Sequence, residues 1–210
     1  MNAPDPLHDQ AREDLCRFVA ACYYEAGPEF AEEKLFDSMR AAAGRVDPEL
    51  EAIARRLGEA FAAAAPEELL IDYTRLFLGP VDALARPYGS VWMGTEKTLM
   101  QESTMDVQAL YAEGGFELAE DFRELPDHVA AELEFLYLLL FRENAARRAG
   151  DAAALEAATM LKHRFLSDHL ARWADPFTAA MRSGAQTAFY RELADLTRRL
   201  VAREAALGRP

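Results

Sequence analysis

Three adjacent residues, Pro126, Asp127 and His128, have side chains suited to proton transfer, metal binding or recognition of a charged ligand. They stand directly before VAAELEFLYLLLF, the most apolar run of the chain. An aspartate and a histidine can act as a catalytic acid/base pair, and both are metal ligands. Because proline favours the first turn of a helix, the same residues could instead form the polar start of an apolar helix.

The catalytic and metal interpretations lack partners in the sequence. Ser90 could complete a triad with Asp127 and His128, but YGSVW is not a nucleophile elbow, and adjacent side chains on a helix point about 100° apart. The residues three positions before His128, His163 and His169 are leucine or methionine, so the Glu-x-x-His motif of di-metal bundles is missing. No phosphate-binding glycine motif is present. We predict that the protein is not an enzyme and has no metal or other cofactor.

The composition favours a soluble protein that binds neither nucleic acid nor the bilayer. With 210 residues, 51% of them hydrophobic, the chain can bury a substantial core. Its net charge of −13 argues against binding to phosphate backbones, which requires basic surface. No run of about 18 residues is free of charge, so no stable membrane insertion is expected, and no secretory signal is visible. Because Cys16 and Cys22 make no disulfide framework, we expect a reduced, cytoplasmic protein.

Apolar residues recur every three or four positions along most of the chain, which is the period of amphipathic helices. Prolines fall at expected first turns, and Asp47, Asp151 and Asp175 are suitable N-caps. The pattern predicts an all-α protein of about nine helices, in one large domain or two small ones; the helices are expected at 8–25, 28–43, 48–64, 66–78, 96–113, 126–149, 151–173, 175–183 and 185–207. The helix at 96–113 has an expected break near 102. Mobile tails are expected at 1–8 and 207–210.

Two connections interrupt the helical pattern. Residues 79–95, GPVDALARPYGSVWMGT, are rich in glycine, proline and aromatic residues, and loops of this length in compact proteins are commonly functional. Residues 114–127 carry five carboxylates and a single arginine, Arg123; the carboxylates are Glu117, Glu120, Asp121, Glu124 and Asp127.

A helix that begins at Pro126 places Asp127 in its first turn, where the helix dipole favours a carboxylate and keeps His128 neutral. Glu124 and Asp127 then form an acidic rim. Because an unpaired carboxylate is costly to bury, we expect this rim to face solvent or an arginine. The helix is apolar nearly all round, which predicts burial; the alternative is that part of its surface is given to a partner.

Five segments of the chain, in this order, resemble the TorD/DmsD/NarJ family, the cytoplasmic chaperones that mature bacterial molybdenum oxidoreductases. The segments are YTRLFLGP at 73–80, ARPYGSVW at 85–92, LYAEGGFEL at 110–118, LPDHVAAELEFLYLL at 125–139 and HRFLSDHLARWADPF at 163–177. The resemblance spans roughly residues 65–180, and the first 65 residues match only in being helical.

The family's P-D-H motif falls on Pro126, Asp127 and His128. Its Y-x-x-L-F motif falls on Tyr73, Leu76 and Phe77, and its P-x-x-S loop falls on Pro87 and Ser90, beside the aromatic residues Tyr88 and Trp92. Gly89 stands where relatives often carry a glutamate, so any role of that acid is missing or displaced. The resemblance implies a single all-α bundle domain over 1–210 that is a monomer or a domain-swapped dimer. It also implies a partner, the catalytic subunit of a molybdopterin oxidoreductase, whose twin-arginine leader is held until cofactor insertion and export.

Such a leader offers two guanidinium groups followed by an apolar stretch, so its receptor needs carboxylates and an apolar groove. We predict that Asp127, Glu124 and the acidic 117–121 segment supply the carboxylates. The groove is predicted from Tyr88, Trp92, Leu76 and Phe77. Trp173, Phe177, His163 and His169 are predicted to be core or supporting residues. Two alternatives stay open: a NarJ-type assembly chaperone for a non-exported nitrate-reductase-like subunit, and a helical enzyme or small-molecule binder.

Overall fold

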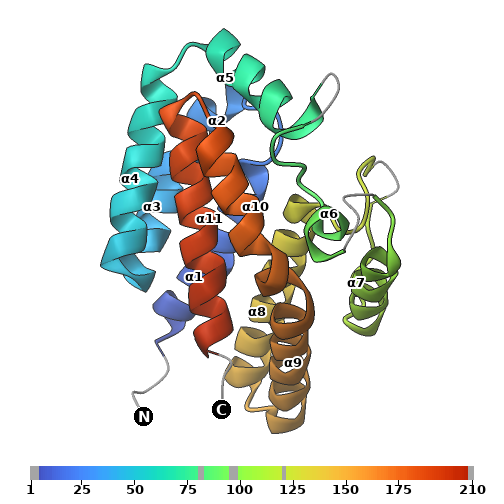
Figure 1. Cartoon of the computed structure of the whole chain (residues 1–210). Helices are drawn as coiled ribbons and strands as arrows, with labels where there is room; N and C mark the ends of the chain where they lie inside the picture. The colour runs from blue at the N-terminus through green and yellow to red at the C-terminus, as the bar shows by residue number, and fades with distance from the viewer. Residues whose placement is uncertain (1–4, 80–82, 95–98, 120–121, 208–210) are drawn as a thin grey trace.

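Helices form the regular structure in the computed structural model of the protein, which describes residues 5–79, 83–94, 99–119 and 122–207 (Figure 1). They are α1 (Pro6–Ala21), α2 (Glu29–Glu32), α3 (Leu35–Val46), α4 (Pro48–Ala63), α5 (Pro66–Tyr73), α6 (Gly89–Met93), α7 (Glu102–Glu113), α8 (Val129–Ala149), α9 (Ala152–Phe165), α10 (Ala171–Gly184) and α11 (Ala188–Leu207). Two π-helical turns, η1 (Thr74–Leu78) and η2 (Leu166–Leu170), extend α5 and join α9 to α10. The all-α prediction is confirmed.

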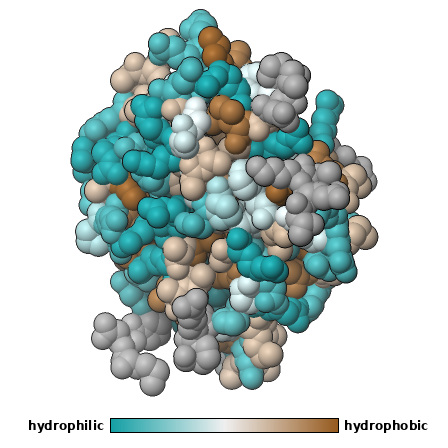
Figure 2. All heavy atoms as spheres, viewed as in Figure 1, coloured by the Kyte–Doolittle hydropathy of each residue, from teal (hydrophilic) through white to brown (hydrophobic). Residues whose placement is uncertain are grey.

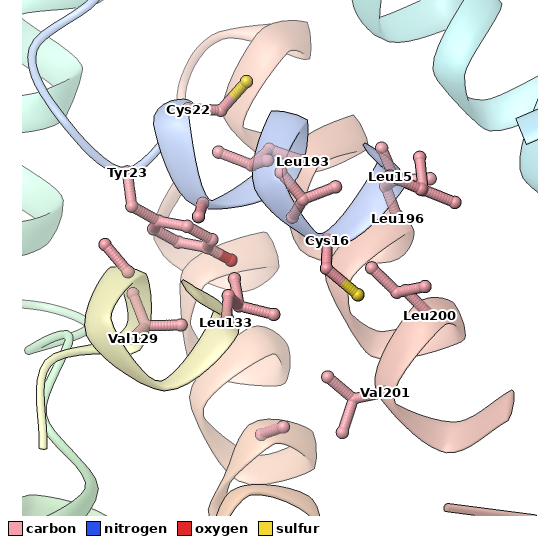
Figure 3. Packing of buried hydrophobic residues seen from close by; sticks show 14 of the residues in the cluster. Leu15, Cys16, Cys22, Tyr23, Val129, Leu133, Leu193, Leu196, Leu200 and Val201 are labelled. Atoms are coloured by element: carbon pink, nitrogen blue, oxygen red, sulfur yellow. The ribbon is translucent and has the colours of Figure 1, made fainter. Parts of the chain in front are cut away.

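The core lies where α1, α8 and α11 meet. α1 packs against α8 and α3, α11 packs against α4 and α10, and α8 packs against α9, whereas α6 and α7 lie to one side (Figure 1). Figure 3 shows Leu133 of α8, Leu193 of α11 and Tyr23, which follows α1, among the side chains of the core; all three are buried. Full burial of a large apolar side chain contributes about 1.5–3 kcal/mol. Cys16 and Cys22 are buried in the same region as free thiols.

Local capping signals fix the helix starts that the sequence predicts best. Asp47 accepts the backbone N–H of Glu49 over 2.8 Å, and Asp151 accepts that of Ala154 over 3.0 Å, so both predicted N-caps are confirmed. At the N-terminus the predicted tail is too long, because Asp5 caps α1 with Pro6 in the first position. The tail predicted from residue 207 is also too long, since Leu207 belongs to α11. Residues 1–4 and 208–210 lie outside the described part of the chain.

Tertiary packing overrides the predicted boundaries at two places. The helix predicted over 28–43 is broken at Lys34, which has a left-handed φ of 53°. A continuous helix would point Phe30 and Leu35 about 140° apart, whereas the break lets both be buried. The start predicted at Asp175 is wrong, because α10 runs through Pro176. Buried Trp173 and Phe177 hold that helix in the core despite the proline.

The long connection at 79–95 contains a short helix, α6, that the apolar pattern of the sequence does not indicate. The helix predicted over 96–113 is described from residue 99 and begins at Glu102, where a break was expected. The face that carries α10 and α11 is largely hydrophilic, with small separate apolar areas (Figure 2). No helix in the described ranges combines the length and apolarity that a bilayer span requires.

Candidate functional site

An isolated antiparallel bridge between Tyr88 and His128 joins the 79–95 connection to the start of α8. The backbone N–H of Gly89 donates to the carbonyl of Asp127 over 2.9 Å, and that of Val129 donates to the carbonyl of Pro87 over 2.8 Å. Two motifs about forty residues apart in the sequence therefore form one unit.

Asp127 lies beneath this bridge and not on a rim. The helix α8 begins at Val129, so Asp127 is outside its first turn, and the side chain is 0% exposed. Its Oδ2 accepts the backbone N–H of Ser90 over 2.8 Å, which caps the start of α6. Its Oδ1 and the Ser90 hydroxyl are buried and make no hydrogen bond to another described residue. The expected exposure of Asp127 is therefore wrong, because the carboxylate is used to anchor the connecting loop.

His128 is the N-cap of α8. Its Nδ1 accepts the backbone N–H of Ala130 over 3.2 Å, and its ring lies 6.3 Å from that of Tyr24 and 5.3 Å from that of Tyr88. Burial lowers the pKa of His128 to about 4, although the nearby carboxylates of Glu124 and Asp127 oppose the shift. The predicted neutral imidazole agrees with this environment, but burial causes it instead of the helix dipole.

An apolar groove was predicted from Leu76, Phe77, Tyr88 and Trp92. The prediction is wrong for Leu76 and Phe77, which do not reach the surface. Leu76 and Phe77 are buried, and the ring of Phe77 packs edge-on against those of Tyr23 and Tyr73. Their place in the π-turn η1 directs them into the core.

The remaining predicted residues of this connection differ in accessibility. Pro87 is buried and Pro126 half-buried. Trp92 is half-buried, donates its Nε1–H to the carbonyl of Arg86 over 2.9 Å and packs against Phe177. Tyr88 is half-buried and keeps part of its ring at the surface. The solvent-facing part of the predicted site is therefore smaller than the sequence implies.

The surface above the bridge is acidic and aromatic. Exposed Glu124 accepts a short hydrogen bond from the hydroxyl of Tyr88. Tyr24 is 37% exposed, and burial together with the carboxylates of Glu134 and Glu124 raises its pKa to about 12. Burial, Glu124 and Glu25 raise the pKa of Tyr73 as well.

Among the residues that the structure describes, no lysine or arginine forms an ion pair with Glu25, Glu124 or Glu134. Of the acidic 117–121 segment, Glu117 is exposed, whereas Glu120 and Asp121 lie outside the described ranges. An acidic, tyrosine-rich surface of this kind suits a guanidinium ligand, which pairs with carboxylates and stacks on aromatic rings.

A buried polar cluster below the site is not predicted from the sequence. Glu132 of α8 accepts the Nε1–H of Trp173 over 3.1 Å, and its Oε1 lies 3.0 Å from Nδ1 of His169. The other ring nitrogen of His169 lies 2.9 Å from the carbonyl of Ser103 at the start of α7. Burial alone would lower the pKa of His169, but Glu132 outweighs it and raises that pKa. The supporting role predicted for His169 agrees with this position.

The same cluster explains Gly89. A Cβ atom at this position would lie 2.9 Å from Nε1 of Trp173 and 3.2 Å from Oε1 of Glu132. No acid therefore fits at residue 89, and the buried carboxylate beside it comes from Glu132. A glutamate inside an apolar run, four residues before a helix face of Leu136 and Leu140, is the signal that could have identified it.

A further buried carboxylate, Asp72, also went unnoticed in the sequence. It accepts the backbone N–H groups of Gln186 and Thr187 over 2.9 Å and 2.8 Å, and the Thr187 hydroxyl over 2.9 Å. Asp72 thereby ties α5 to the start of α11. In the described part of the chain no group of three His, Cys, Asp or Glu side chains is arranged to hold a metal.

Comparison with known proteins gives a consistent set of relatives. The chaperone protein TorD of Photobacterium profundum is 29% identical over 123 residues, which cover 59% of this chain and 56% of that protein. A selenate reductase assembly chaperone protein of Thauera selenatis is 47% identical over 62 residues, covering 29% of this chain and 31% of that protein. The chain thus spans little more than half the length of the TorD relative.

The fold has a relative among solved structures. The crystal structure of a candidate redox enzyme maturation protein from Archaeoglobus fulgidus matches with a TM-score of 0.56 and 19% identity, over 91% of this chain and 93% of that one. The family model described as nitrate reductase delta subunit matches residues 43–179, which include the bridge, Asp127 and the Glu132 cluster. This chain belongs to the nitrate reductase delta subunit family, as its resemblance to TorD, DmsD and NarJ indicated.

Proposed function

We propose that the protein is a cytoplasmic chaperone for the catalytic subunit of a molybdopterin oxidoreductase. In this proposal it binds the N-terminal twin-arginine leader of that subunit and holds it until the cofactor has been inserted and export can begin. Family membership supports the assembly role, since relatives are named as TorD and selenate reductase assembly chaperones. The observation that carries the leader-binding part is the acidic, aromatic surface over the Tyr88–His128 bridge.

The ten residues predicted for this site divide into two groups by burial. Glu124, Tyr88, Trp92 and Pro126 are accessible at least in part and are proposed to contact the leader. The buried residues are proposed to hold that surface in place without touching the peptide: Asp127, His128, Ser90, Pro87, Leu76 and Phe77. A buried carboxylate and two backbone hydrogen bonds anchor the loop at Pro87–Ser90, which supports a contact surface that is formed before binding.

Calorimetry with leader peptides tests the proposal. The peptides are the twin-arginine leaders of the molybdopterin oxidoreductases of the same genome, and the controls are leaders of exported proteins without molybdenum. We expect at least one molybdoenzyme leader to bind with a dissociation constant near 1 μM, or about −8 kcal/mol. Binding should weaken with added salt, because the paired charges lie at the surface. The proposal is wrong if none of these leaders binds, or if the control leaders bind equally well.

The family match also supports a second candidate, assembly of a non-exported nitrate-reductase-like subunit. Its client has no twin-arginine leader, so the two candidates differ in the role of arginine. Replacing both arginines of a bound peptide with glutamine should abolish binding to a leader chaperone. A client segment that binds with the same affinity after this replacement favours the second candidate.

A further inference from the structure

One face of α8 is apolar but is not enclosed by the core. Glu134, Tyr137, Leu138 and Phe141 follow each other at helical spacing on this face, and Phe141 is 43% exposed while the other three are half-buried. The rings of Tyr137 and Phe141 lie 6.3 Å apart. We call these four residues the α8 stripe. The other side chains of α8 from Val129 to Leu140 are buried, so the stripe is the accessible part of this half of the helix; beyond Phe141, Arg142 and Arg148 are exposed as well.

Helix α1 runs beside the α8 stripe in the opposite direction. At one end Tyr24 stacks on His128, and further along Arg17 lies 6.0 Å from the ring of Tyr137. Tyr24 therefore stands at the end of the stripe that meets the Tyr88–His128 bridge. The stripe and the acidic surface of the candidate site form one continuous path.

The charge changes sign along this path. Glu124 and Glu134 lie near Tyr24 at the bridge end, and Glu25 follows Tyr24 in the chain. The basic residues come after them: Arg17 lies over the ring of Tyr137, and Arg142 and Arg148 lie beyond Phe141 on α8. Glu134 has no hydrogen bond or ion pair with any residue that the structure describes, although burial raises its pKa. A half-buried carboxylate without a partner is unfavourable in the free protein. A cation that pairs with Glu134 has a more favourable Coulomb energy than one at the open surface, because the local dielectric constant is lower.

We propose that the leader docks along the α8 stripe, with an arginine paired to Glu134 beside Tyr24 and the following apolar residues on Tyr137, Leu138 and Phe141. This proposal rests on the proposed function and assigns the binding path within it. The stripe spans eight residues of α8, from Glu134 to Phe141, with a rise of about 10 Å, which is the length of two helical turns. An apolar stretch of leader in helical form therefore matches it. The reverse orientation is disfavoured, since it places the arginines next to Arg142 and Arg148.

Fluorescence anisotropy with two synthetic peptides tests this path. One peptide carries two adjacent arginines followed by a run of leucine and alanine, and the other has glutamines in place of the arginines. Glu134→Gln should weaken binding of the arginine peptide about tenfold to a hundredfold, which corresponds to the loss of one charge-assisted contact. It should leave the weak affinity for the glutamine peptide unchanged. Phe141→Ala should weaken binding of both peptides by a similar factor, because it removes only apolar contact.

Two matched variants on α9 control for charge and for apolar surface. Glu156→Gln removes an exposed carboxylate, Met160→Ala removes a side chain that is 65% exposed, and both should bind like the wild type. The docking path is wrong if Glu134→Gln binds the arginine peptide as tightly as the wild type does. It is also wrong if Glu134→Gln weakens binding of both peptides equally and lowers the Tm of the protein, because that result indicates a structural role for Glu134. Wild-type protein that binds neither peptide nor any molybdoenzyme leader overturns the proposed function itself.

Discussion

Replacing Asp127 with asparagine is expected to destabilise the fold, although the two side chains have nearly the same shape. The carboxylate is 0% exposed and accepts the backbone N–H of Ser90 over 2.8 Å. That hydrogen bond caps α6 and lies next to the Gly89–Asp127 backbone hydrogen bond of the Tyr88–His128 bridge. The substitution therefore weakens the attachment of the 79–95 connection to α8.

The size of the effect follows from the kind of hydrogen bond. A bond to a charged acceptor contributes about 1.5–3 kcal/mol, and one between neutral groups contributes about 0.5–1.5 kcal/mol. The asparagine NH2 group must also occupy the position of Oδ1, which has no described partner. We expect a loss of about 1–2 kcal/mol in the free energy of unfolding. For a domain of this length that corresponds to a decrease in Tm of about 2–8 °C.

Urea denaturation followed by circular dichroism measures this loss, and Ser90→Ala is the matched control. The Ser90 hydroxyl is buried without a described partner, and alanine keeps the backbone N–H that Asp127 accepts. Ser90→Ala should therefore change the stability by no more than about 0.5 kcal/mol. Wild-type stability in Asp127→Asn, combined with lost leader binding, would refute the reasoning. That result would mean that Asp127 meets the leader directly.

Three further predictions concern the groups around the site. Burial lowers the pKa of His128 from 6.5 to about 4. The stability that the neutral imidazole gives to the fold is therefore complete above pH 6.5 and is lost as the pH falls toward 4. Urea titrations over that range should show a loss of up to about 3 kcal/mol, which His128→Asn, an N-cap that does not titrate, should lack. Asp72→Ala leaves the N–H groups of Gln186 and Thr187 without their acceptor. It should lower the free energy of unfolding, measured by guanidinium denaturation, by about 2–4 kcal/mol, and a loss below about 1 kcal/mol contradicts the role of Asp72 in holding α11. Gly89→Ala places a Cβ 2.9 Å from Nε1 of Trp173 and should lower the free energy of unfolding by about 1–3 kcal/mol. It should also alter the near-UV circular dichroism spectrum, and an unchanged spectrum counts against the close contact.

Local patterns in the sequence determined the fold class and several boundaries. Apolar spacing identified α4 and α11 closely, because each helix has one buried face and is amphipathic by itself. Asp47 and Asp151 were identified as caps because the capping hydrogen bond joins residues two or three positions apart. The residues proposed for the site were also found from local patterns, since P-D-H and P-x-x-S are short motifs. These features depend on neighbours in the chain, which the sequence lists directly.

Only the tertiary structure decided which site residues face solvent. Asp127 is buried because Ser90, 37 positions away, donates to it, and Glu132 is buried because Trp173 and His169 come to it from 41 and 37 positions away. The path of α10 through Pro176 likewise depends on packing that outweighs a local helix penalty of about 3 kcal/mol. A carboxylate can be buried once distant donors surround it, and no local pattern specifies where those donors will lie. For this reason the acidic residue types of the candidate site and the exposure of Glu124 were predictable, whereas the burial of Asp127 and the half-buried position of Glu134 became evident only from the packing of α1, α6 and α8.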